Sequence, residues 1–220
     1  MKFVRCESKY QNFYEKANFS VIVNGVNIDE YPPEKAVNES SYFTLMTTAR
    51  IVERKGIQHV IAALPRISIE TDSNIRYIIV GDGPYRKEIV ALARELEVDK
   101  YVEITGMLPF EHVKMRLLKA DLFILTSHWE GMPNSVVEAM ASHLPIIMTN
   151  CEGSSELVED NGFIIDLKSD IEESIATYVL ELYRNRDLCM EMGKNSYERV
   201  LNHFSWEKST KAFLERGTNP

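Results

Sequence analysis

The chain contains one stretch that decides its fold, Leu122-Phe123-Ile124-Leu125-Thr126-Ser127-His128-Trp129-Glu130-Gly131-Met132-Pro133-Asn134-Ser135-Val136-Val137-Glu138-Ala139-Met140. Its first four residues form an apolar run that predicts a buried strand. Gly131 and Pro133 then break the chain, and a helix is expected from about Ser135 to Ser142. At the start of such a helix several backbone N–H groups have no helical partner, and the helix dipole favours negative charge. The stretch therefore predicts a strand, a loop and a helix with a place for an anion.

Two carboxylates flank this loop: Glu130 lies within it, and Glu138 follows eight positions later in the first turns of the helix. A carboxylate beside a bound phosphate can accept hydrogen bonds from hydroxyl groups. A site that takes both phosphate and hydroxyls suggests a nucleotide sugar. A second interpretation stays open, in which Ser135 and Glu138 form a capping box that binds nothing and Glu130 is a solvated loop acid.

The composition is that of an ordinary soluble globular protein, with 220 residues of which 45% are hydrophobic and 26% charged. Asp and Glu outnumber Lys and Arg by 33 to 25, which argues against nucleic acid as a partner, because backbone binding needs a basic face. No run of about 18 apolar residues occurs, so no transmembrane segment is expected. The early polar residues do not resemble a signal peptide, and the 3 distant cysteines indicate reduced thiols. A cytoplasmic location is therefore expected.

Apolar and helical patterns alternate regularly from Tyr42 onward. Strands are expected over 43–48, 76–80, 102–105, 122–126, 145–149 and 163–165. Helices are expected over 57–69, 85–96, 110–119 and 135–142, and residues from about 170 to 216 are expected to be helical with a break near 203–205. A short strand over 3–6 and a helix over 9–17 are expected before them. The alternation predicts an α/β fold, a Rossmann-like parallel sheet with helices on both faces.

Sheets of this kind bind ligands at the carboxyl ends of their strands. Polar and glycine residues follow one expected strand after another: Arg50 and Lys55, then Gly81 to Pro84, Gly106, Glu130, and Glu152 to Glu156. Because parallel strands end at the same edge of a sheet, we expect these residues to lie around one site.

Arg50 and Lys55 lie five positions apart after the first strand. Arginine offers a planar fork to two phosphate oxygens, and lysine supplies a compact positive charge. Together with a helix N-terminus they can hold a diphosphate without a metal. The alternative is a solvated basic loop in which Glu53 pairs with one of the cations.

Two further loops carry weaker signals. Gly81-Asp82-Gly83-Pro84 lacks a nucleotide-binding glycine pattern and is interpreted as structural. Backbone amides at Gly106, Met107 and Leu108 can meet the edge of a nucleobase. His128 and His143 lack a companion at metal-ligand spacing, so no metal site is expected.

Several motifs occur together in one order. They are Val23-Asn24-Gly25-Val26, Arg50 with Lys55-Gly56, Gly81-Asp82-Gly83-Pro84, Glu130-Gly131-Met132-Pro133 with Glu138, Glu156-Leu157-Val158-Glu159-Asp160, and Phe204-Ser205-Trp206. This arrangement, over about residues 20 to 215, resembles the C-terminal, nucleotide-sugar-binding domain of retaining glycosyltransferases of the GT-B fold, in glycosyltransferase family 4 (glycosyl transferases group 1). One departure is His143, at a position where the family commonly has glycine.

The resemblance implies a role for each motif. Arg50 and Lys55 would bind the donor's diphosphate and, with Glu130 beside the transferred sugar, form the catalytic set. Glu138 would accept hydrogen bonds from the ribose hydroxyls. The backbone would contact sugar and phosphate at Met132, Pro133, Asn134, Ser135 and Val136, and the base at Gly106, Met107 and Leu108.

The resemblance also implies a domain organisation. Residues 1–20 would be the tail of a missing N-terminal acceptor domain, 21–205 the donor-binding Rossmann-like domain, and 206–220 a C-terminal helix that crosses back to the missing domain. The chain would then be half of a two-domain cleft and would be inactive or weakly active alone. Peripheral attachment to a membrane would come through the missing domain.

The implied reaction moves a glycosyl group from a UDP- or GDP-sugar, without a cofactor, to a saccharide or lipid-linked acceptor with retention of configuration. It would serve polysaccharide or glycoconjugate biosynthesis, such as that of capsule or lipopolysaccharide. Two alternatives stay open: a non-catalytic α/β binding or regulatory module such as a receiver-like domain, and a GT-B relative such as a nucleotide-sugar epimerase or phosphorylase.

Overall fold

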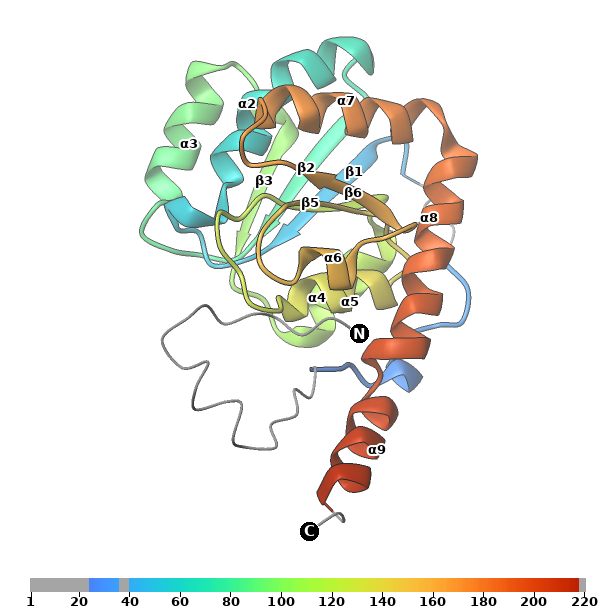
Figure 1. The fold of residues 1–220 in the computed structure, drawn as a ribbon. Coiled ribbons are helices and arrows are strands. Elements are labelled where there is room, and N and C mark those ends of the chain that lie inside the picture. The colour runs from blue at the N-terminus through green and yellow to red at the C-terminus, as the bar shows by residue number, and fades with distance from the viewer. Residues whose placement is uncertain (1–23, 36–39, 218–220) are drawn as a thin grey trace.

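The computed structural model describes residues 24–35 and 40–217. Its centre is a 6-stranded sheet with the order β3-β2-β1-β4-β5-β6, and helices cover both faces (Figure 1). The strands are β1 (Phe43–Thr48), β2 (Ile75–Val80), β3 (Val102–Gly106), β4 (Leu122–Leu125), β5 (Ile146–Thr149) and β6 (Gly162–Ile165). All neighbouring pairs run parallel, which confirms the predicted parallel sheet.

The helices alternate with the strands along the chain. They are α2 (Ile57–Glu70), α3 (Arg86–Glu95), α4 (Phe110–Lys119), α5 (Asn134–Ala141), α6 (Ser154–Leu157), α7 (Ile171–Arg184), α8 (Arg186–Arg199) and α9 (Trp206–Gly217). Short 3-10 turns occupy η1 (Ile28–Glu30), η2 (Glu53–Lys55) and η3 (Asp99–Tyr101), and a π turn, η4 (Val200–Phe204), joins α8 to α9.

The core has two layers, one on each face of the sheet. Successive residues of a strand point to opposite faces, so Leu45 packs with α2, α3 and α7 while Met46 packs with α4 and α5. Both residues are fully buried. Strands buried on both faces need continuous apolar runs, which is what the sequence offers in β4 and β5. Helix α9 projects away from these layers (Figure 1).

The structure corrects two expectations about the helices, confirms a third, and does not describe the residues of a fourth. The helical stretch expected from about 170 is broken at Asn185, whose side chain accepts a hydrogen bond from the N–H of Leu188 and caps α8. The break expected near 203–205 is confirmed, because η4 ends at Phe204 and Ser205 is extended. A short helix, α6, lies where only a turn was expected. The strand and helix expected over 3–6 and 9–17 lie outside the described residues.

The order of the strands positions the site. β1 and β4 are neighbours at the centre of the sheet, yet β1 leads to α2 on one face and β4 leads to α5 on the other. The chain thus leaves these two neighbouring strands toward opposite faces of the sheet, and the carboxyl ends of strands at such a switch point are where α/β sheets bind ligands.

Candidate functional site

The loops after β1 and β4 approach each other at Gly56. A Cβ at Gly56 would lie 1.9 Å from the main-chain oxygen of Thr126, and the residue has a φ of +70°. Only glycine fits such a close approach with such a backbone angle. The Thr126 hydroxyl donates to the Gly56 oxygen at 2.8 Å, and the His128 N–H donates to the Arg54 oxygen at 2.9 Å. The two loops are thereby fixed against each other.

Lys55 and Glu130 form an ion pair across these loops. Their side chains are only 14% and 10% exposed, and the Ser127 hydroxyl donates to the same carboxylate oxygen, Oε1, at 2.7 Å. The interpretation of Glu130 as a solvated loop acid is therefore wrong. So is the pairing of Glu53 with a cation of its own loop, since within the described part of the chain the Glu53 carboxylate makes no ion pair.

Arg50 lies at the carboxyl end of β1 with an exposed side chain. Among residues 24–35 and 40–217 its guanidinium makes no hydrogen bond or ion pair. The role of Arg50 in holding a diphosphate stays a prediction.

Helix α5 begins at Asn134, with Pro133 at its N-cap and no side-chain cap. This start lies within one residue of the expected one, and it places Ser135 inside the helix, so the capping box of Ser135 and Glu138 is wrong. The N–H of Val136 bonds the oxygen of Pro133, whereas those of Asn134 and Ser135 meet no acceptor within the described residues. Two donors at the positive end of the helix are thus available to an anion.

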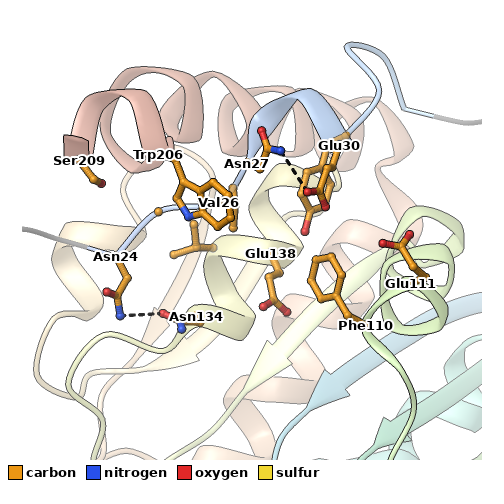
Figure 2. A pocket seen from close by; sticks show the side chains of 13 residues that line it. Asn24, Val26, Asn27, Glu30, Phe110, Glu111, Asn134, Glu138, Trp206 and Ser209 are labelled. Atoms are coloured by element: carbon orange, nitrogen blue, oxygen red, sulfur yellow. Dashed lines mark hydrogen bonds between the residues drawn. The ribbon is translucent and has the colours of Figure 1, made fainter. Parts of the chain in front are cut away.

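Glu138 faces a pocket of about 690 Å³ between the starts of α4, α5 and α9 (Figure 2). Burial raises the pKa of its carboxyl above the ordinary value, and no described side chain makes a hydrogen bond or ion pair with it. The pocket is lined by Asn24, Gly25, Val26, Asn27, Glu30, Tyr31, Phe110, Glu111, Asn134, Val137, Glu138, Trp206 and Ser209. Its acids and amides suit hydroxyl and N–H donors, and its aromatic rings suit a flat apolar group.

The segment from Asn24 to Asn27 closes one side of this pocket. Main-chain hydrogen bonds tie Val26 to Phe204 and Trp206 at 2.9 and 3.0 Å, and the Asn24 amide donates to the Asn134 side chain at 3.1 Å (Figure 2). The buried hydroxyl of Tyr31 has no hydrogen-bond partner among the described residues.

The loop after β3 lies beside the neighbouring strand end. Gly106 has a φ of +75°, and its oxygen accepts from the N–H of Gly81 at 3.0 Å. Met107 is 85% exposed, while Leu108 packs on the cluster around α4 and α5. A Cβ at Gly81 would lie 1.9 Å from the oxygen of Ala49, which supports the structural interpretation of its motif.

The residues predicted from the sequence fall into two groups: those with a contact or a position near the start of α5, and those with no described contact to the first group. Lys55 pairs with Glu130, and Asn134 and Glu138 line the pocket. Met132 is half-buried, Pro133 and Val136 are buried and Ser135 is half-buried, all near the start of α5. Within the part of the chain that the structure describes, no hydrogen bond or ion pair joins these residues to Arg50, Gly106, Met107 or Leu108.

Sequence reasoning missed several pocket residues, among them Tyr31, Phe110 and Trp206. Trp206 belongs to one of the motifs, which is a signal that could have found it, but no residue near it in the sequence indicates a pocket. No cluster of three or more potential metal ligands occurs within the described residues. In the same part of the chain, no helix is long and apolar enough to cross a membrane.

Comparisons with known proteins agree with this architecture. Residues 27–199 match the family model described as glycosyl transferases group 1. The GDP-mannose-dependent alpha-(1-6)-phosphatidylinositol monomannoside mannosyltransferase of Mycobacterium tuberculosis is 28% identical over 212 residues, which are 89% of this chain and 54% of the relative. The lipopolysaccharide core biosynthesis glycosyltransferase LpsE of Rhizobium meliloti is 27% identical over 173 residues, 78% of this chain and 48% of the relative. The chain thus spans about half the length of these curated relatives.

Among solved structures, Anabaena Alr3699/HepE in complex with UDP and glucose superposes with a TM-score of 0.80 at 21% identity, over 91% of this chain and 57% of that one. At this identity the likeness concerns the fold alone. The chain belongs to the glycosyl transferases group 1 family, and its sheet has the Rossmann-like α/β fold of a GT-B glycosyltransferase domain.

Proposed function

We propose that this chain is the donor-binding half of a retaining glycosyltransferase that uses a UDP- or GDP-sugar and a saccharide or lipid-linked acceptor. In this proposal residues 21–205 bind the donor, 1–20 are the tail of an acceptor domain, and 206–220 form a helix that crosses back to it. The observation that carries the proposal is the Lys55–Glu130 pair beside the open N-terminus of α5, with Glu138 in the adjoining pocket.

The diphosphate would lie between the start of α5 and the cations of the loop after β1. Cleavage of the bond between sugar and phosphate builds negative charge on the departing diphosphate, and donors fixed in advance around it lower the barrier. The N–H groups of Asn134 and Ser135, the Lys55 ammonium and the Arg50 guanidinium would supply these donors. Glu130 already holds Lys55 and would accept hydrogen bonds from the transferred sugar.

The nucleoside would enter the pocket beside Glu138. Burial raises the pKa of the Glu138 carboxyl, and no described side chain donates a hydrogen bond to it. Ribose hydroxyls would supply these hydrogen-bond donors. Main chain at Gly106, Met107 and Leu108 would meet the base. The names of the relatives support a nucleotide donor: one is GDP-mannose-dependent, and the Anabaena structure holds UDP and glucose.

Calorimetric titration of UDP and GDP into the protein tests this proposal. We expect binding of at least one nucleotide, weakened about tenfold or more by Lys55→Ala and by Arg50→Ala, because a hydrogen bond to a charged group contributes about 1.5–3 kcal/mol. Lys194→Ala is the matched control, since Lys194 lies on α8 with a side chain that is 74% exposed. Absence of heat with both nucleotides, or equal affinities in all variants, would contradict the proposal.

A further inference from the structure

Three titratable side chains from three elements lie in line next to the loop that carries Glu130. Oε1 of Glu172, on α7, is 2.6 Å from Nδ1 of His59, on α2. Nε2 of His59 is 3.3 Å from Nε2 of His128, which lies two residues before Glu130. The two imidazole rings are nearly parallel, with an interplanar angle of 18° and centroids 5.6 Å apart. No sequence pattern connects these residues, since His59 lies 69 positions before His128 and 113 positions before Glu172.

With both rings neutral, the hydrogen-bond partners set the tautomer of each ring. An ionised carboxylate only accepts, so Nδ1 of His59 carries the hydrogen that bonds Glu172. A neutral imidazole has one N–H, so Nε2 of His59 is an acceptor. Nε2 of His128 must then be the donor. The result is a directed chain in which His128 donates to His59 and His59 donates to Glu172.

This chain of hydrogen bonds is attached to the loop that carries Glu130. The N–H of His128 donates to the oxygen of Arg54 at 2.9 Å, and the Arg54 guanidinium donates to the oxygen of Trp129 at 3.2 Å. On the other side, the main-chain oxygen of Ser127 accepts from the Thr149 hydroxyl. The ring of His128 thus links this loop to α2 at a point two residues before Glu130.

We propose that His59 and Glu172 are positioning residues, which hold His128 and thereby keep the Glu130 loop in its nucleotide-binding geometry. This proposal rests on the proposed function insofar as that loop contacts a nucleotide sugar. Neither residue touches the donor itself; both act through His128.

NMR of the ring nitrogens tests the first half of the proposal without any nucleotide. In ¹⁵N-labelled protein at pH 8, we expect His59 as the Nδ1–H tautomer and His128 as the Nε2–H tautomer. Glu172→Gln offers His59 both a donor and an acceptor, so it should mix the His59 tautomers and shift the backbone amide signals of residues 128–130. The matched control Glu173→Gln neutralises the next carboxylate on the same helix and should leave both unchanged. An Nε2–H tautomer at His59, or unshifted amides in Glu172→Gln, would overturn the proposal.

Nucleotide affinity at pH 8 tests the second half. His59→Ala removes the partner of His128, so it should weaken UDP or GDP binding about fivefold, the effect of one lost hydrogen bond. The control Glu173→Gln leaves that contact in place and should bind as the unaltered protein does. Equal affinities of His59→Ala and the unaltered protein would overturn the proposal. If neither protein binds a nucleotide, the proposed function fails, and the NMR result alone decides whether His59 and Glu172 position the loop.

Discussion

Lys55 and Glu130 lie 75 positions apart in the chain and form an ion pair where the loops after β1 and β4 meet. Neither loop contains the pair by itself, because the partners follow two strands that become neighbours only in the folded sheet. The pair places a cation and a carboxylate side by side at the carboxyl ends of the central strands, where the proposed sugar diphosphate would offer them phosphate oxygens and hydroxyls. The same ion pair is also expected to stabilise the folded state.

Breaking this pair should destabilise the fold. Lys55→Ala leaves the Glu130 carboxylate, in a residue only 8% exposed, with the Ser127 hydroxyl as its remaining partner. Loss of one member of a largely buried pair should lower the free energy of unfolding by about 1–3 kcal/mol. Urea denaturation measures it, and a double-mutant cycle with Glu130→Gln should give a coupling of about 1 kcal/mol or more. The exposed pair of Lys194 and Glu198 is the control, and a coupling there as large as at Lys55 and Glu130 would contradict this account.

Glu138 should couple nucleotide binding to pH. Burial raises the pKa of its carboxyl, and the ionised form accepts hydrogen bonds from ribose hydroxyls more strongly than the protonated form. Affinity for UDP or GDP should therefore rise as pH increases through this raised pKa and fall below it. Glu138→Gln should weaken binding about tenfold at pH 8 and flatten the dependence, as followed by calorimetry. A Glu138→Gln protein with the pH profile of the wild type would exclude this role.

The same carboxyl should act on stability with a defined sign. Its pKa in the folded state lies above that in the unfolded chain, so the folded state binds more protons between the two values. The stabilisation is complete below the unfolded pKa and is lost as pH rises through the folded one. Glu138→Gln should therefore raise the melting temperature by about 2 °C at pH 8 and leave it nearly unchanged at pH 4. A lower melting temperature for Glu138→Gln at pH 8 would show that the carboxylate stabilises the fold.

Gly56 and Gly131 provide a matched pair for the geometry of the two loops. Gly56→Ala would place a Cβ 1.9 Å from the oxygen of Thr126 at a φ of +70°, whereas a Cβ at Gly131 meets nothing within 4 Å. We expect Gly56→Ala to lower the free energy of unfolding by about 3 kcal/mol or more, and Gly131→Ala to change it by less than about 0.5 kcal/mol. Urea denaturation of both variants measures the difference. Equal stabilities would mean that the loops do not approach as closely as described.

The sequence predicts the sheet well because its signals are local. The apolar runs of β4 and β5 and the helical spacing in α2 each lie within one element, so their pattern alone indicates strand or helix. The break at Asn185 escaped prediction because helix-compatible residues surround it, and only its side-chain bond to Leu188 shows that a new helix starts there.

The site is less predictable because its contacts join distant segments. The pair of Lys55 with Glu130 and the pocket that brings Tyr31 and Trp206 to Glu138 depend on loops and helices that meet only after folding. The capping box failed for a smaller reason: α5 starts at Asn134 with Pro133 at its N-cap, so Ser135 is the second residue of the helix and not its cap. This placement leaves Glu138 without a helix-capping partner and directed into the pocket (Figure 2).

His143 has a left-handed backbone conformation, which glycine adopts more readily than other residues. Its φ is +57°, while its ring stacks on Tyr197 with centroids 4.1 Å apart and its Nε2 lies 3.0 Å from the oxygen of Pro32. The ring contacts thus offset the cost of a left-handed backbone, which is about 1 kcal/mol for a residue with a Cβ. This explains how histidine can replace the glycine that the family resemblance led us to expect.

Two substitutions separate these effects. His143→Ala loses the ring contacts and keeps the backbone cost, so it should lower the free energy of unfolding by about 2 kcal/mol. His143→Gly loses the same contacts but is relieved of that cost, so it should be more stable than His143→Ala by about 1 kcal/mol, although Gly normally destabilises relative to Ala through the entropy of the unfolded chain. Urea denaturation of the three proteins at pH 8, where the lowered pKa of His143 keeps the ring neutral, measures both steps. If the alanine variant proves the more stable of the two, the backbone at 143 is not left-handed in solution, and the stacking on Tyr197 needs another explanation.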